Sequence, residues 1–404
     1  MLQHTPILKS TLTAHSVQGP KPLNEDRGCA RINTSHRVQA MAVFDGHGGE
    51  GGALAAQTAK ETCERFLVVN DRVYDAWDGR QWMVQLKELF ATMHANIRVA
   101  LLASAPAGER YAVDGQGVVR KADGKPVHGG TTATVVVSSR HADGRRFLVH
   151  ANVGDSEAFL VASDGRHMLP LTANHKPSNP AEYRRIRALD TPLRFVYDKA
   201  GDPDIFTANG EKDERYVRDP WGNGLKPSNV RYEPGSYVSF NEAHGDFVRL
   251  AMTRSLGDFY AHPYGVTAEP TMNVVELADD VQDASVVVAS DGVWDVWQYE
   301  AFAAYVAQLK SSNALSAERV MAKSMEQAYA SFGRNAYDDS TLVLLQLPNR
   351  VQVPVAPAPA AAASMGGFGY VAPAQAAAPM GGFGYVAPTR AAAAASPAGK
   401  TYEF

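Results

Sequence analysis

Five short segments, spread from Asn24 to Thr341, each carry an aspartate or a glutamate at the end of an expected strand or at the start of a loop. The segments are Asn24–Asp26, Val43–Gly49, Asn152–Ser156, Ala289–Gly292 and Tyr337–Thr341. Carboxylates with flanking glycines and almost no cysteine nearby are typical of a site for hard divalent cations, which take oxygen ligands. Such cations activate water and bind phosphate oxygens. The pattern therefore predicts a metal-dependent hydrolase.

Composition narrows the class of protein. The formal net charge of -4 shows no basic excess, which argues against nucleic acid as the main partner. No apolar run approaches the roughly 20 residues of a membrane span, and the first residues lack the basic and apolar regions of a signal peptide. Only Cys29 and Cys63 are present, which is too few for a disulfide framework and consistent with a reducing compartment. We therefore expect a soluble monomer of the cytoplasm or nucleus that binds neither membrane nor nucleic acid.

The chain divides into a part that can fold, residues 1–348, and a tail, residues 349–404. The tail is mostly Ala, Pro and Gly, and the nonapeptide MGGFGYVAP begins in it at Met365 and again at Met380. This composition cannot bury a core, so we expect the tail to be disordered. The alternative is a tail that binds an unknown partner through the aromatic residues of its repeats. Those residues are Phe368, Tyr370, Phe383 and Tyr385.

Strands and helices do not alternate regularly within the folded part. Short apolar strands are expected at 38–44, 131–138, 285–289 and 341–347, together with a hairpin over 148–161 that turns at Gly154 and Asp155. Helical spacing of apolar side chains predicts helices at 52–69 and 82–102 and near 301–309 and 315–329. Two helices, many strands and two further helices favour an α+β fold, with sheets in the middle and helices outside.

Two stretches do not fit this simple pattern. Residues 105–127 contain four glycines and predict a hairpin excursion. Residues 190–244 are rich in Pro, Gly, Asp and Asn, and a loop of that size in a compact domain is usually functional.

The segment around Asp45 offers three groups with distinct chemistry. Asp45 ends an expected strand, where its carboxylate can bridge two cations, and Gly46 leaves its carbonyl free to bind one. The imidazole of His47 can titrate near neutral pH and donate a proton to a leaving group. Taken alone, the segment would fit a glycine-rich turn with a surface histidine equally well. The other acidic segments make the functional interpretation the stronger one.

The remaining carboxylates also have structural alternatives. Asp291 follows a buried strand in the position of a ligand, whereas Asp295 fits the cap of the helix that follows. Adjacent Asp338 and Asp339 repel each other unless a cation or solvent separates them, so a metal explains the pair better than a polar turn does. Asp155, on its own, fits a tight turn.

A basic run offers a competing phosphate site. Arg184, Arg185 and Arg187 could contact phosphate, but on a short helix we expect them to form a solvated face.

Taken together and in order, these segments resemble the type 2C (PPM) family of metal-dependent serine/threonine protein phosphatases. Three further segments carry the resemblance, which covers roughly residues 12–348: Gly129–Ala133, Leu171–Pro177 and Thr253–Asp258. The resemblance implies a four-layer α-β-β-α sandwich with two central antiparallel sheets flanked by helices. Residues 190–244 would then form an enlarged version of the family's flap.

The resemblance also implies a set of metal ligands. Asp45 would bridge two Mg²⁺ or Mn²⁺ ions. The Gly46 carbonyl and Glu25, through water, would bind one ion, and Asp291 and Asp338 would bind the other.

Four further positions follow from the same resemblance. Asp155, with Asp291, would hold a weaker third ion, and His47 would be the general acid. Lys21 replaces the family's phosphate-binding arginine and keeps its charge but not its bidentate fork. Asp339 would occupy the position of the family's asparagine, although the aspartate doublet leaves a shift of one residue open.

The implied activity is hydrolysis of phosphoserine and phosphothreonine in phosphoprotein substrates by a metal-bridging water. The alternative is an inactive pseudophosphatase that binds phosphoproteins. Loss of metal aspartates would favour that alternative, whereas every ligand position is filled in this chain.

Overall fold

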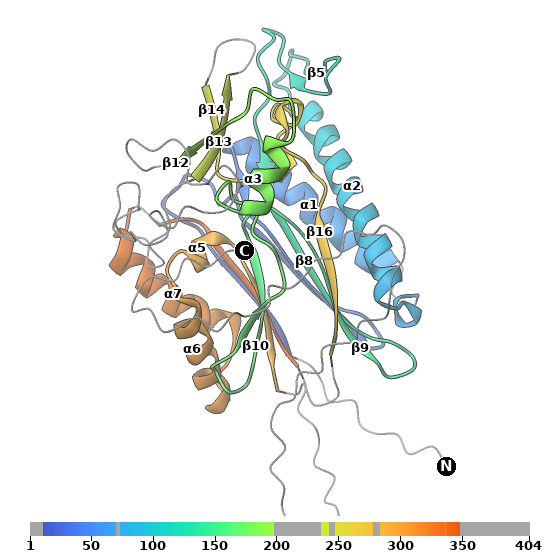
Figure 1. The fold of residues 1–404 in the computed structure, drawn as a ribbon, viewed down its shortest axis with the longest axis vertical. Coiled ribbons are helices and arrows are strands. Elements are labelled where there is room, and N and C mark those ends of the chain that lie inside the picture. Colours follow the sequence, from blue (N-terminus) through green and yellow to red (C-terminus); the bar gives the residue numbers. More distant parts are fainter. Residues whose placement is uncertain are drawn as a thin grey trace, which may run out of the picture. The chain divides into compact units, whose positions relative to one another are not determined.

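The apolar strands of the sequence pair into two five-stranded antiparallel sheets (Figure 1). This computed structural model describes residues 11–69, 73–197, 236–241, 247–277, 283–335 and 337–347. In spatial order, the first sheet contains β1 (Thr11–Val17), β18 (Ser340–Gln346), β17 (Ser285–Ala289), β10 (Glu157–Val161) and β11 (Met168–Pro170). The second contains β16 (Thr271–Leu277), β9 (Arg146–Val153), β8 (Ala133–Arg140), β3 (Val38–Phe44) and β2 (Arg27–Ile32).

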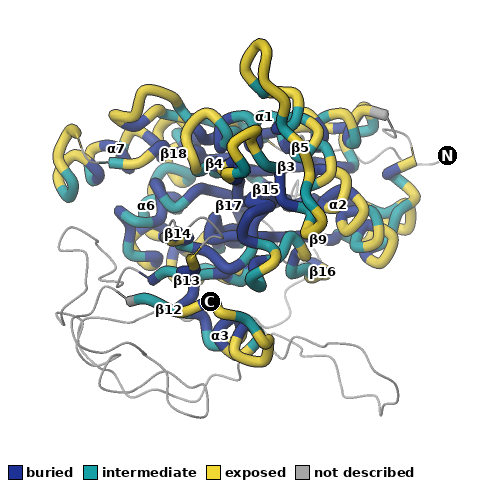
Figure 2. The backbone as a smooth tube through the Cα atoms, turned by 90° about the horizontal axis from the view of Figure 1, so that it is seen from above, coloured by how far each residue is buried: buried dark blue, intermediate teal, exposed yellow. Residues whose placement is uncertain are grey.

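Alternate residues of each central strand face opposite sides of its sheet, as the two-residue period of a strand requires. In β3, Met41 and Val43 lie in the core between the two sheets, whereas Ala42 and Phe44 belong to an outer core. Strands β17 and β18 divide their residues between the inner core and the opposite outer core in the same way. Because both faces of these strands are buried, their sequences are mostly apolar, and Figure 2 shows them as the buried centre of the fold.

Helices cover both outer faces of the paired sheets (Figure 1). On the second sheet lie α1 (Glu50–Val69) and α2 (Gly79–Ala103), and on the first lie α5 (Asp291–Trp294), α6 (Tyr299–Ser311) and α7 (Ala317–Phe332). The side chain of Asp78 caps α2 by accepting hydrogen bonds from the backbone of Arg80 and Gln81. The layers confirm the predicted α-β-β-α sandwich, and the four longer helices lie close to their expected positions.

The antiparallel register brings the acidic segments to one end of the two sheets. Phe44 at the end of β3 pairs with Arg27 at the start of β2. Ala289 at the end of β17 pairs both with Leu342 of β18 and with Glu157 at the start of β10. The loops that follow β3, β9 and β17 and those that precede β2 and β18 therefore meet at a single edge.

The predicted hairpin over residues 148–161 is wrong. Strand β9 pairs with β8 and β16, whereas β10 pairs with β17 and β11, so the chain crosses from one sheet to the other between them. Gly154 allows this crossing because its φ of 95° is accessible to glycine and a Cβ there would lie 2.6 Å from Thr132. Alternating apolar residues indicate a strand but do not identify its partner, and this is why the error arose. The crossing places Asp155 at the edge where both sheets end.

A smaller module lies at that same end (Figure 1). It contains α3 (Pro180–Arg187) and a sheet of β12 (Arg194–Tyr197), β13 (Ser236–Asn241) and β14 (Phe247–Leu250). The predicted hairpin excursion is confirmed as β5 (Ala112–Val113) and β6 (Val119–Arg120), and Val118 from it joins the core of the module. Short 3₁₀ turns occur at Tyr74–Ala76 and His262–Tyr264.

Several predictions fall outside the described residues. Of the predicted flap insertion, only residues 190–197 and 236–241 are described, and the predicted tail with its two repeats lies entirely outside. None of the helices in the described ranges combines the length and the apolar character that a membrane span requires.

Candidate active site

A three-stranded sheet of very short strands positions the central segment of the site. It consists of β15 (Leu256–Gly257), β7 (Gly130–Thr131) and β4 (Gly46–His47). Just before β4, the backbone N–H of Asp45 donates to the hydroxyl of Thr132 over 3.0 Å, and the N–H of Thr132 donates to the Asp45 carbonyl over 2.8 Å. Both backbone groups of Asp45 are therefore fixed at the point where its carboxylate leaves the sheet.

The predicted carboxylates gather closely enough to perturb one another. Burial raises the pKa of Asp45 well above its ordinary value, and the charges of Asp26, Asp291, Asp338 and Asp155 raise it further. Like charges at short range oppose each other's ionisation, so these groups favour either protons or a nearby cation. The structure thus brings together carboxylates that are far apart in the sequence.

Asp291 and Asp155 show the same behaviour. Burial raises the pKa of Asp291 well above its ordinary value, and neighbouring carboxylates, Asp155 and Asp295 first, reinforce the effect. Burial likewise raises the pKa of Asp155, although the charge of Lys176 opposes the shift. Both carboxylates therefore belong to the same electrostatic cluster as Asp45.

The donors of this cluster fit a hard divalent cation in kind and in charge. Buried oxygens of Glu25 (Oε1), Asp26 (Oδ1) and Asp155 (Oδ1) have no hydrogen-bond partner. Unpaired carboxylate oxygens in a buried setting are costly unless a cation or water satisfies them. Within the described ranges, no group of three His, Cys, Asp or Glu side chains has its ligand atoms close enough together to hold one metal ion.

Lys21 is the main basic group on the other side of the cluster. Its ammonium lies 2.5 Å from Asp338 Oδ1 and 3.8 Å from Glu25 Oε2. Burial lowers the pKa of Lys21, but the charge and hydrogen bond of Asp338 outweigh burial and the net shift is upward. Lys21 is therefore a fixed positive charge beside the carboxylates, as a phosphate-binding group would have to be.

The two members of the aspartate doublet have different surroundings. Asp339 is almost fully buried and accepts hydrogen bonds from the backbone N–H groups of Gly19 (2.6 Å) and Glu25 (2.8 Å). The side chain of Asp338 is 51% exposed and contacts Lys21. Asp339 thus holds the loop that carries Lys21 and Glu25. Asp338 is the more exposed member, and its Oδ1 is engaged by the Lys21 ammonium and by the backbone N–H of Asp339.

His47 is paired with a carboxylate that sequence reasoning did not assign. His47 Nε2 lies 2.6 Å from Asp258 Oδ2, and the hydroxyl of Ser255 donates to the same oxygen over 2.6 Å. A Cβ on Gly130 would lie 2.1 Å from the Asp258 carboxylate, so a larger residue at position 130 would displace Asp258 from its place beside His47. The Thr253–Asp258 segment was part of the sequence pattern, but its partner could not be known before β15 and β4 were found on either side of β7.

The charges of this pair reinforce each other. Burial alone lowers the pKa of His47. The charge of Asp258 and its hydrogen bond to the ring outweigh burial, so the net shift of the His47 pKa is upward. Burial alone raises the pKa of Asp258, but His47 and the hydrogen bond from Ser255 outweigh it and lower the pKa. The pair therefore favours a protonated imidazole beside an ionised carboxylate.

Two further residues have roles that differ from the sequence predictions. Asp295 does not cap the helix that follows, because Gln298 holds the N-cap position of α6 and Asp295 lies at the C-terminal end of α5. Its charge instead adds to the cluster around Asp291. Asp26 was not assigned a role, yet it is buried, accepts a hydrogen bond from Ser290 Oγ over 2.7 Å, and has a pKa raised by burial to about 7.

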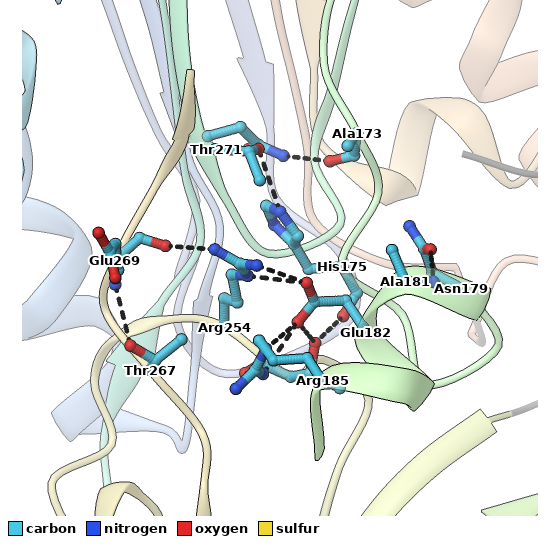
Figure 3. A network of polar contacts seen from close by, with 12 residues as sticks. Ala173, His175, Asn179, Ala181, Glu182, Arg185, Arg254, Thr267, Glu269 and Thr271 are labelled. Carbon is cyan, nitrogen blue, oxygen red and sulfur yellow. Dashed lines mark hydrogen bonds and ion pairs between the residues drawn. The ribbon is translucent and has the colours of Figure 1, made fainter. Parts of the chain in front are cut away.

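A largely buried ion-pair network joins α3 to the segments around Thr253 and Gly265 (Figure 3). Glu182 on α3 accepts hydrogen bonds from Arg254 (2.6 and 3.0 Å) and from Arg185 (2.9 Å). Arg185 also donates to the carbonyls of Gly265 and Thr253. The prediction that this arginine forms part of a solvated face is therefore wrong, because Glu182, three residues earlier, turns it toward the interior.

Comparison with known proteins identifies the family of the chain. The family model described as protein phosphatase 2C matches residues 10–196 and 230–335. The chain belongs to the protein phosphatase 2C family. It is 31% identical over 365 residues to "Probable protein phosphatase 2C 38" of Oryza sativa subsp. japonica, covering 82% of this chain and 68% of that relative.

Other members of the family show the same relationship. Over 257 residues the chain is 30% identical to "Probable protein phosphatase 2C 8" of the same rice, which covers 63% of this chain but only 47% of the relative. The chain thus spans about half the length of that rice phosphatase 2C. Among solved structures, serine-threonine phosphatase 2C from Toxoplasma gondii matches 84% of this chain and 95% of its own, with a TM-score of 0.50 and 15% identity. That likeness supports the type 2C fold.

Proposed function

We infer that this chain is an active, metal-dependent protein phosphatase that hydrolyses phosphoserine and phosphothreonine. The observation that carries the proposal is the carboxylate cluster around Asp45, which places excess negative charge beside one ammonium and one imidazole. Membership of the protein phosphatase 2C family supports it. In this family the expected ions are Mg²⁺ or Mn²⁺.

The proposed ligands are those of the sequence prediction. Asp45 would bridge two ions, with Glu25 (through water) and the Gly46 carbonyl on one side and Asp291 and Asp338 on the other. Asp155 and Asp291 would hold a weaker third ion. When bound, the ions supply a nucleophilic water and neutralise charge on the phosphate. The unpaired oxygens of Glu25 and Asp155 and the exposure of Asp338 support this assignment.

Lys21 and His47 would act on the substrate itself. The Lys21 ammonium would bind the phosphate oxygens as a point charge, and its position against Asp338 places it at the edge of the cluster. His47 would donate a proton to the oxygen of the leaving serine or threonine, and Asp258 would orient the ring that does so. Aryl phosphates, which have better leaving groups, need that proton less.

The activity itself can be tested with a phosphoserine peptide and purified protein. Turnover should require added Mn²⁺ or Mg²⁺ at millimolar levels and should stop in excess EDTA, because oxygen sites that retain waters bind such ions modestly. Full turnover in EDTA would contradict the metal-dependent mechanism. Specific binding of the peptide without any turnover would instead favour the pseudophosphatase.

The roles of His47 and Asp258 can be separated from metal binding by the choice of substrate. His47→Ala should slow a phosphoserine peptide by about 10²–10⁴-fold, and p-nitrophenyl phosphate much less, because general acid catalysis matters only when the leaving oxygen needs a proton. Asp258→Asn keeps the shape of the side chain and should show the same selectivity for substrate with a smaller loss. An equal loss on both substrates would mean that His47 does not protonate the leaving group.

A further inference from the structure

A cavity of about 430 Å³ opens beside the proposed catalytic histidine. Its wall includes Gly48, whose Cα is only about 3.8 Å along the chain from that of His47. The rest of the lining comes from the start of α1, the end of α2 and the segment that carries the β5–β6 hairpin. Its volume lies within the range of pockets that bind small ligands or side chains.

The floor of the cavity is apolar. Leu101, Pro126 and Val127 are buried, and Leu54 and Tyr111 are partly buried. A floor of this kind accepts the hydrocarbon part of a bound group but provides no counter-charge.

The rim carries two lysines at paired positions of a turn. The backbone N–H of Lys121 donates to the carbonyl of Lys125 over 2.8 Å, and the adjoining bridge pairs Arg120 with Pro126. Residues directly opposite in an antiparallel pair have Cβ atoms about 5 Å apart, and like charges there are destabilising. An anion between the two ammonium groups would relieve that repulsion.

Neither of these lysines is neutralised within the described part of the chain. No carboxylate there lies within ion-pair distance of either ammonium, in contrast to the neighbouring Arg120, which pairs with Asp114 at 2.5 Å. The only acidic side chain on the lining is that of Glu50 at the opening of α1. The lining therefore carries two ammonium groups and one carboxylate. Asp123, in the same turn, is not part of the lining, and its carboxylate accepts a hydrogen bond from the backbone N–H of Lys125 over 3.0 Å.

We propose that this cavity binds a second anionic side chain of the substrate, a carboxylate or a phosphate close in sequence to the phosphoserine that is hydrolysed. The proposal rests on the proposed function, because the substrate that reaches His47 is then a protein segment, and Gly48 in the cavity wall is the next residue of the chain. The apolar floor would hold the aliphatic part of the neighbouring residues, and Lys121 and Lys125 would bind the charge. The enzyme would therefore prefer acidic or multiply phosphorylated segments.

The test uses two peptide series around one phosphoserine. In one series a glutamate replaces each residue in turn, up to four positions on either side, and in the other a glutamine does so. At one or more positions we expect the glutamate peptide to have a kcat/KM about 5- to 30-fold above that of its glutamine partner, as two partly exposed charge contacts would give. The double variant Lys121→Gln/Lys125→Gln should bring the two peptides to near equality.

Matched controls separate a local effect from a general loss of charge. Lys87→Gln/Lys323→Gln removes the same charge from exposed positions elsewhere, Lys87 being about 21 Å along α2 from Leu101, and should keep the preference. Glu50→Gln removes the opposing charge on the rim and should increase the preference for the glutamate peptide. Turnover of p-nitrophenyl phosphate should be the same in all these variants.

Equal rates for both series in the wild-type protein, or a preference that survives in Lys121→Gln/Lys125→Gln, would overturn the proposal. Binding of inorganic phosphate at these lysines without discrimination between peptides would overturn it too. Fluorescence polarisation of the same labelled peptides provides a readout that needs no turnover. If neither the phosphoserine peptides nor p-nitrophenyl phosphate are hydrolysed, the proposed function fails, and the binding preference still decides the role of the cavity.

Discussion

Replacing Glu182 by glutamine should destabilise the protein strongly, although the change removes only a charge. The Glu182 side chain is 3% exposed, and its two oxygens accept hydrogen bonds from Arg254 and Arg185 (Figure 3). In Glu182→Gln the shape is kept, but two guanidinium groups lose their shared counter-charge. Both are largely enclosed, with side chains 14% and 25% exposed.

Two independent arguments give the magnitude. Burial alone would raise the pKa of Glu182, but the hydrogen bond from Arg254 and the charges of His175, Arg254 and Arg185 outweigh it and lower the pKa from 4.5 to about 2. A shift of this size corresponds to about 3 kcal/mol in favour of the ionised form. Removing one partner of a buried ion pair costs about 3–5 kcal/mol, and the partial exposure of the arginines favours the lower end. We therefore expect Glu182→Gln to lower the free energy of unfolding by about 3 kcal/mol.

Urea denaturation at pH 7, followed by tryptophan fluorescence, measures this change as a lower midpoint with an unchanged slope. Because the folded-state pKa of Glu182 is depressed, its contribution is complete above pH 4.5 and is lost as pH falls toward 2, so the variant and the wild type should converge in acid. Glu326→Gln is the control, since Glu326 is 67% exposed in its pair with Lys323 and should matter by less than about 0.5 kcal/mol. A loss below about 1 kcal/mol in Glu182→Gln would refute the reasoning.

The aspartate doublet and a buried histidine provide further tests. Asp338→Ala should abolish metal-dependent turnover of a phosphoserine peptide with little change in melting temperature, whereas Asp339→Ala should cost about 2–4 kcal/mol because two buried N–H groups lose their acceptor. A stable but inactive Asp339→Ala would show that Asp339, and not Asp338, is the metal ligand. Burial lowers the pKa of His150 to about 4, so its contribution to stability is complete above pH 6.5 and is lost as pH falls toward 4. Between pH 7 and 4.5, wild type should therefore lose about 2–3 kcal/mol more than His150→Leu, and equal losses in urea titrations would contradict this.

The sequence alone determined several central strands, the four longer helices and the position of most acidic groups at strand ends. The short apolar run of strands such as β3 and the helical spacing in α2 are local properties, so they could be recognised without the fold. The acidic residues follow or precede those strands directly. Their placement at strand ends was therefore predictable, and so was the chemistry of a hard-cation site.

The tertiary structure decided which of these groups act together. Sequence periodicity could not assign β9 and β10 to different sheets, because strand partners are chosen by packing between residues far apart in the chain. Nor could it pair His47 with Asp258, which meet only because β4 and β15 both lie against β7. Asp338 and Asp339 are adjacent and chemically identical, and only burial against the backbone of Gly19 and Glu25 distinguishes them. The sequence specifies the chemical type of each side chain. The burial of a side chain and the groups it contacts are decided only when distant segments pack together.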